Sequence, residues 1–219
     1  MSFKLFKLKQ TYILIIIQKK HDYKIIMIWG EEMKIGASDM KKAIEEIYKI
    51  LDSVTPVDFD CGSLCGEACC VYDLKNPEEE LALYLLPGEE LMYEESDSFD
   101  LYYFDRDEID YPPSWDDVVY IVKCRNPPKC DRSIRPIQCR TFPLVPHIDE
   151  NGEFHLVLDE TEFPYECPIA SQHMKFNDDF LTVTFDVWKK LISNPLVYDF
   201  VEMDSRLRDE RTRDYEIVI

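Results

Sequence analysis

The segment Cys61-Gly-Ser-Leu-Cys65-Gly-Glu-Ala-Cys69-Cys70 holds four of the chain's eight cysteines within ten residues. Thiolate sulfur is a ligand of zinc and of iron-sulfur clusters, and close spacing lets one loop supply several ligands. The three-residue gaps between its first three cysteines fit the spacing typical of zinc sites, and the two glycines allow the backbone to curl around an ion. The segment therefore predicts a metal site around which the fold is organised.

The adjacent cysteines Cys69 and Cys70 are harder to place on one ion, because consecutive side chains tend to diverge. Three alternatives stay open for one member of this pair. It binds a second ion, it bridges two ions, or it stays outside the ligand set as a thiol.

The remaining cysteines all follow this segment, and none lies outside residues 61 to 167. We expect them to form a second four-ligand set: Cys124, Cys130, Cys139 and Cys167. Residues 118 to 140 carry six basic residues against one acid. We expect Arg132, Arg135 and Arg140 from this basic island to offset part of the thiolate charge.

A chain of 219 residues with 46% hydrophobic content suits one domain. Its net charge of -19 argues against nucleic acid or an anionic membrane as the main partner, because both bind basic surfaces. Residues 78 to 117 hold fifteen acids and one base. This acidic segment is expected to be a solvated surface, and the alternative is docking of a basic protein partner.

Eight cysteines would form four disulfides in a secreted protein, so the N-terminus bears on the redox compartment. Three lysines followed by the apolar run 12–17 resemble the start of a signal peptide, but no small-residue cleavage site follows. The run is also too short to span a bilayer. We therefore expect a reducing cytoplasm, no membrane partner, and zinc or an iron-sulfur cluster as the cofactor.

Residues 1–32 fit poorly with the rest of the chain. They are rich in lysine and isoleucine and show no clear period, so we expect a mis-assigned translation start or disorder, with Met33 as the true start. The alternative is an edge strand at 11–17. Residues 33–219 then form a single cysteine-cluster domain, with its core at 57–170 and C-terminal helices at 177–213.

Periodicity predicts the elements of this domain. Apolar residues at helical spacing predict a helix from Ser38 that ends before Pro56, and Asn76-Pro77 predicts a second helix that stops at Pro87-Gly88. A β-branched run predicts a strand at 118–122, whereas 99–111 is interpreted as a surface segment with a short strand at 101–104 as the alternative. Residues 142–159 predict a hairpin that turns at Asn151-Gly152, with prolines confining its first arm to a sheet edge.

Two C-terminal helices complete the prediction. Asn177 caps a helix whose core stripe is Leu181, Phe185, Trp188 and Ile192, and Asn194-Pro195 starts another that uses Val197, Phe200 and Val201. The predicted class is α+β, a small antiparallel sheet with helices at both ends, organised around a cysteine-ligated metal core.

These motifs also match a known family. The order of the eight cysteines, the segment Arg135-Pro-Ile-Gln-Cys139-Arg-Thr-Phe-Pro143 and the dipeptide Cys167-Pro168 resemble the YkgJ-like cysteine-cluster family, described as zinc- or iron-chelating proteins. The resemblance spans residues 57 to 170. It implies that all eight cysteines are metal ligands, and Arg135 and Arg140 match family positions.

The expected function is a metal-binding protein whose cysteine core has a structural or an electron- or metal-handling role. The alternative is an enzyme related to the protein lysine N-methylases that carry such a cluster, or an iron-sulfur oxidoreductase. The chain's six glycines form no G-x-G-x-x-G loop, and no helix-borne acid/base pair stands out. The sequence therefore leaves open whether the protein is an enzyme.

Overall fold

The computed structural model describes residues 16–19, 22–27, 31–34, 37–71, 82–105, 111–115, 118–127, 132–158, 165–211 and 215–219. Its helices are α1 (Ala37–Asp52), α2 (Gly62–Cys65), α3 (Ala68–Val71), α4 (Ile137–Thr141), α5 (Pro168–Ser171), α6 (Asp178–Leu191) and α7 (Pro195–Arg211), with 3-10 helices η1 (Glu89–Met92) and η2 (Arg132–Ile134). Its strands are β1 (Ile16–Lys19), β2 (Asp22–Met27), β3 (Glu31–Lys34), β4 (Ala82–Tyr84), β5 (Phe99–Asp105), β6 (Val118–Cys124), β7 (Leu144–Ile148), β8 (Phe154–Leu158) and β9 (Glu216–Ile217).

The described strands form three separate antiparallel sheets, with the orders β1-β2-β3, β4-β6-β5 and β7-β8-β9. The predicted α+β class is confirmed. The expectation of one small sheet is wrong, because the 118–124 strand and the 144–158 hairpin pair with different partners rather than with each other.

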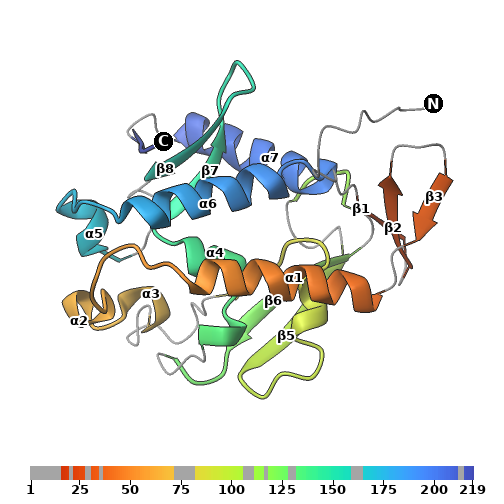
Figure 1. Ribbon diagram of the computed structural model, residues 1–219, viewed down its shortest axis with the longest axis horizontal. Coiled ribbons are helices and arrows are strands. Elements are labelled where there is room, and N and C mark those ends of the chain that lie inside the picture. The colour runs from red at the N-terminus through yellow and green to blue at the C-terminus, as the bar shows by residue number, and fades with distance from the viewer. Residues whose placement is uncertain are drawn as a thin grey trace.

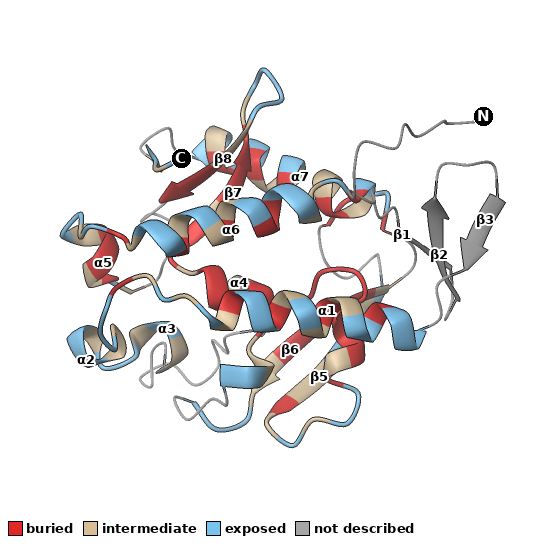
Figure 2. Cartoon of the chain, viewed as in Figure 1, coloured by how far each residue is buried: buried red, intermediate tan, exposed pale blue. Residues whose placement is uncertain are grey.

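The main hydrophobic core lies between α1, α6, α7 and the β7–β8 hairpin. Figure 1 shows α6 between α1 and this hairpin, and Figure 2 shows that the buried residues gather on the facing sides of these elements. Leu51, Leu156, Phe180, Trp188 and Val201 are almost completely buried there. Each such side chain contributes roughly 1.5–3 kcal/mol to stability.

The predicted first helix is confirmed, and its buried stripe is the expected one: Met40, Ile44, Tyr48 and Leu51. The stripe predicted for α6 is confirmed at Trp188, and its other three residues pack only partly buried against the core. The buried residues of α6 are Phe180, Thr184, Val187 and Trp188, whereas Leu181, Phe185 and Ile192 are half-buried. The helix packs against both α1 and β8, so its buried face is set by two neighbours rather than by its most apolar stripe.

The second sheet has β6 at its centre, and both of its faces are covered. Val122 points to a cluster with Leu85 and Phe99, whereas Val119 and Ile121 point to the opposite face. The indole Nε1 of Trp115 donates a hydrogen bond of 2.9 Å to the carbonyl of Leu196, and its ring stacks on Phe200. The sheet is thereby fixed to α7.

Two predictions around this sheet are corrected. The predicted helix from Asn76 is wrong at residues 82–84, where β4 pairs with β6 in the register Leu83↔Val122. Its first residues lie outside the described part of the chain. Residues 99–105 form a seven-residue strand rather than an irregular surface segment, although Tyr103 stays 70% exposed.

The hairpin at 142–159 is confirmed. Asn151 and Gly152 form its turn, and Gly152 has a φ of 79°, which favours glycine. Pro146 lies in the edge strand β7, as predicted. The C-terminal strand β9 pairs with the other side of β8.

The N-terminal segment forms a three-stranded meander in which Ile17 pairs with Lys24 and Ile25 with Met33. The predicted edge strand at 11–17 overlaps β1, and its first five residues lie outside the described part. A translation start at Met33 stays a prediction. Among the described residues, no helix combines the length and apolar character needed to cross a membrane.

Candidate metal site at the cysteine-rich end

The cysteine-rich segment folds as two four-residue helices, α2 and α3, joined at Gly66. Gly66 has a left-handed φ of 63°, and Glu67 donates its backbone N–H to the carbonyl of Gly62 at 3.0 Å. A left-handed residue at this place is typical of glycine, so the turn of the chain at Gly66 is as expected. Gly62 lies within α2 and has no positive φ, and the curling of the backbone around an ion stays a prediction. The turn brings α3 back beside α2.

The adjacent cysteines do not diverge as expected, and the three alternatives for the role of the pair stay predictions. The Sγ atoms of Cys69 and Cys70 are 3.9 Å apart, and a hydrogen bond between the two thiols raises the pKa of Cys69. Two sulfurs bound to one tetrahedral zinc at about 2.3 Å lie about 3.8 Å apart. The pair therefore has the separation of two ligands on one ion.

Cys167, at the start of α5, lies near the first cysteine segment, while its expected grouping with Cys124, Cys130 and Cys139 stays a prediction. It is buried at the start of α5, and Figure 1 shows α2, α3 and α5 at the same end of the molecule. Burial raises the pKa of the Cys61 thiol, and the neighbouring charges of Cys167, Asp60 and Cys65 raise it further. Cys61 and Cys167 thus influence each other across about 100 residues of sequence.

Tyr165 connects a third cysteine-bearing segment to this end. Burial raises the pKa of its phenol, and the charges of Cys69, Cys167, Cys139 and Cys70 raise it further. The ring of Tyr165 packs near Phe142, with 6.1 Å between the ring centroids. The neighbourhood of Tyr165 therefore gathers cysteines from α3, from α4 and from the start of α5.

Two predicted ligands remain, Cys124 and Cys130, and the structure describes only Cys124. Cys124 ends β6 opposite Phe99 and packs in the cluster of Tyr93, whereas Cys130 lies outside the described residues. Within the described ranges, no three cysteine sulfurs come within ligating distance of one another. Among these residues the cysteines therefore form no closed metal site, and a cysteine-ligated metal core stays a prediction.

A buried glutamate that the sequence did not single out holds α4 in place. Glu89 is completely buried and accepts hydrogen bonds from the hydroxyl of Tyr48 at 2.7 Å, from the N–H of Ile137 at 2.7 Å and from the N–H of Leu86 at 3.1 Å. Tyr93 contacts the Tyr48 hydroxyl at 2.8 Å. Burial raises the pKa of Glu89, while these hydrogen bonds oppose that shift.

This network adjoins the cysteine site through α4. Ile137 begins the helix that carries Cys139, and the pKa of Tyr93 is raised by burial, by Glu89 and then by Cys139. The pattern Gly88-Glu89-Glu90 was visible in the sequence as part of an acidic run. Its burial depends on Tyr48, 41 residues away, so no local signal could have found it.

Two arginines of the basic island bind an aspartate. Arg140 and Arg132 both bind the carboxylate of Asp52 at the end of α1, with N···O distances of 2.5 and 3.3 Å. Arg125 binds Asp100 at 2.9 Å. Arg132 and Arg140 therefore join segments of the fold through Asp52, and the expected compensation of thiolate charge stays a prediction.

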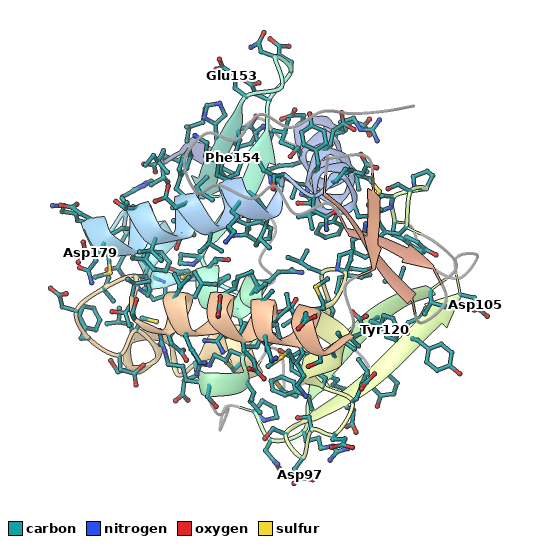
Figure 3. The ribbon with its side chains drawn as sticks, turned by 45° about the vertical axis from the view of Figure 1, so that its right-hand side comes forward. Asp97, Asp105, Tyr120, Glu153, Phe154 and Asp179 are labelled. Atoms are coloured by element: carbon teal, nitrogen blue, oxygen red, sulfur yellow. The ribbon has the colours of Figure 1, made fainter. Side chains whose placement is uncertain are left out.

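A second group of metal-binding residue types lies on the β7–β8 hairpin. One ligand atom from each of Asp149, Glu153 and His155 lies within 4.8 Å of the others, and Figure 3 shows Glu153 at the tip of the hairpin. Asp149 Oδ1 already accepts the N–H groups of Asn151 and Glu153 at 2.9 and 2.8 Å. These bonds lower the pKa of Asp149 and explain the group as part of the turn.

Comparison with known proteins adds no relative to this picture: no family model, no curated protein and no solved structure matches the chain.

Proposed function

We propose that the cysteines of this protein bind either zinc or an iron-sulfur cluster. The bound metal has a structural role or serves in the handling of electrons or metal ions. The observation that carries the proposal is the convergence of three distant segments on one end of the molecule. Six cysteines raise the pKa of a neighbouring thiol or of the Tyr165 phenol: Cys61, Cys65, Cys69, Cys70, Cys139 and Cys167. The resemblance to the YkgJ-like family supports these six ligands, and it implies Cys124 and Cys130 as ligands in addition.

The structure favours an external ligand for this end on energetic grounds. Helix α2 has no buried residue, and a four-residue helix has little stability of its own. A structural zinc ion supplies about 10–16 kcal/mol of folding free energy in small domains. The thiols must stay reduced to bind it, so the proposal places the protein in a reducing compartment such as the cytoplasm.

Metal analysis tests the proposal directly. The full-length protein is purified without oxygen, its metal and sulfide are measured, and its visible spectrum is recorded. Colourless protein with stoichiometric zinc supports a zinc site, and brown protein with iron and sulfide supports a cluster with a redox role. Protein that holds neither metal, as purified or after reconstitution, contradicts the proposal.

Serine variants test the composition of the ligand set. Cys61→Ser is expected to lose most of the bound metal, and the 3.9 Å spacing of the pair predicts equal losses for Cys69→Ser and Cys70→Ser. Cys124→Ser is the matched control, because Cys124, the last residue of β6, packs against the buried cluster that contains Tyr93. A loss of metal in Cys124→Ser as large as in Cys61→Ser would show that the gathered six cysteines are not a separate site.

A basic protein partner is the second candidate function, favoured by one observation. Exposed tyrosines of β5, Tyr102 and Tyr103, follow the exposed acids Glu94, Glu95 and Asp97, and Figure 3 shows Asp97 and Asp105 directed away from the body of the molecule. Binding of a lysine-rich peptide that weakens with salt and with Glu94→Gln/Glu95→Gln is expected. Equal binding by the double variant would contradict this surface.

A further inference from the structure

One carboxylate joins three segments that carry or flank the cysteines. Asp52 is the last residue of α1, and its Oδ1 lies 2.5 Å from Nη1 of Arg140 and 3.3 Å from Nε of Arg132. Arg140 directly follows Cys139, and Arg132 lies two residues after Cys130. The chain that leaves Asp52 reaches Cys61 nine residues later.

The Arg140 arm of this junction is rigid. Its side chain is 1% exposed, its Nε donates to the carbonyl of Arg135 at 2.6 Å, and its guanidinium carbon lies 4.2 Å from the ring centroid of Tyr48. Nη1 also donates to the carbonyl of Tyr48 at 3.2 Å. A buried guanidinium that loses its carboxylate is strongly destabilised, so α4 depends on Asp52 for its position against α1.

The segment between Asp52 and Cys61 is also held by hydrogen bonds to its backbone carbonyls. Nη2 of Arg132 donates to the carbonyl of Val54 at 2.8 Å. Asn177 donates from its side chain to the carbonyl of Thr55 at 3.1 Å and from its backbone to the carbonyl of Pro56 at 2.9 Å. The side chain that was expected to cap α6 thus fixes the approach to the cysteine segment.

We propose that Asp52 is a positioning residue of the cysteine site: it sets the distance between the segment that begins at Cys61 and the helix that carries Cys139. The inference rests on the proposed metal-binding function for its consequence, although the junction itself is independent of any metal. Partners of metal ligands typically change metal affinity about 10- to 100-fold when they are lost. We expect an effect of that size from Asp52, which touches no sulfur.

The test compares Asp52→Asn with wild type as full-length purified proteins. The rates at which Cys61 and Cys139 react with an alkylating reagent are measured by mass spectrometry, and both are expected to rise severalfold in Asp52→Asn. Metal affinity, measured by competition with a chelator, is expected to fall about 10- to 100-fold. Asp52→Glu, which restores the carboxylate, is expected to bring the alkylation rates and the metal affinity most of the way back to the wild-type values.

The control is Asp39→Asn, which removes the same charge from the exposed start of the same helix, where Asp39 lies 3.9 Å from Lys42. It is expected to behave as wild type. Arg132→Gln removes the more exposed arm, so it should raise the reaction rate at Cys61 and leave Cys139 unchanged. If Asp52→Asn does not fold, the reaction rate of Cys61 in Arg132→Gln tests the inference in its place.

An unchanged rate at Cys139 in folded Asp52→Asn overturns the inference, as does an equal effect from Asp39→Asn. Failure of the proposed function gives a different result. Wild-type protein would then bind no metal, while the alkylation rates would still report whether Asp52 couples the two segments.

Discussion

The two ends of the molecule satisfy their polar groups in opposite ways. Near the C-terminus, His147 and Arg208 are almost completely buried, and they bond to each other and to Asp204 and Tyr215. Tyr215 in turn donates to Asp209 at 2.8 Å. This network is closed by the protein's own side chains.

The cysteine end has no comparable closure among its described residues. Cys69 is exposed, Cys61 and Cys65 are half-buried, and the helices that carry them are four residues long. Sulfur is a weak hydrogen-bond donor and acceptor, so thiols alone stabilise such a segment poorly. One polar cluster is therefore complete within the chain, whereas the other is completed by an ion in the function proposed above.

Removal of the metal is expected to have the largest effect and to separate the two ends. In a chelator under reducing conditions, backbone amides of residues 61–71 and 168–171 should exchange hydrogen much faster, because metal binding and folding are coupled there. Amides of α7 should keep their protection. Hydrogen exchange read by mass spectrometry checks this, and an equal loss of protection in α7 would contradict the contrast between the ends.

Loss of Arg208 is expected to have the next largest effect, confined to the other end. Arg208→Leu removes a buried guanidinium that binds the 40% exposed carboxylate of Asp204 at an N···O distance of 2.6 Å, and it leaves His147 without its donor, so the free energy of unfolding should fall by about 1–3 kcal/mol. Urea denaturation measures the change. Arg206→Leu, on an exposed turn of the same helix, is the control and should change stability by less than about 0.5 kcal/mol.

Protonation of His147 is expected to have the smallest effect. Arg208 can donate only, so Nδ1 of His147 is the acceptor and Nε2 faces the hydroxyl of Tyr215 at 3.0 Å. Burial lowers the pKa of His147, and the charge of Arg208 lowers it further. The folded state therefore binds fewer protons than the unfolded state between this lowered pKa and the ordinary value near 6.5.

The sign of the pH effect follows from that difference. Stability should be at its full value above about pH 6.5 and should decrease as the pH falls toward the lowered pKa of His147. His147→Gln keeps a donor and an acceptor but does not titrate, so its stability should vary less with pH across that window. Urea denaturation from pH 7.5 to 5 checks the slope, and equal slopes for both proteins would contradict the assignment.

Much of the fold could be predicted where a local period existed. The apolar spacing of α1, the β-branched run of β6 and the Asn-Gly turn of the hairpin each depend on nearby residues, and each is confirmed. The strand at 82–84 could not be predicted, because its helix-forming composition is overridden by pairing with β6.

The density of thiols in 61–70 predicts the candidate site, and its ligand set stays a prediction. The approach of Cys167 to Cys61 could not be predicted from the sequence, because it is set by tertiary packing. The same holds for Asp52, whose partner Arg140 lies 88 residues away. Contacts between residues so far apart in the sequence cannot be predicted from the local pattern of charge or hydrophobicity.

The distance along the chain between Cys61 and Cys167 has a consequence for synthesis in the cell. Translation proceeds at roughly 5–20 residues per second, so Cys167 is made about 5–20 seconds after Cys61. During that interval the thiols of residues 61 to 70 can meet ions and oxidants before their partner on α5 exists. The thiols of residues 61 to 70 are thus exposed to other ions and to oxidants for far longer than they would be if their partners were neighbouring cysteines.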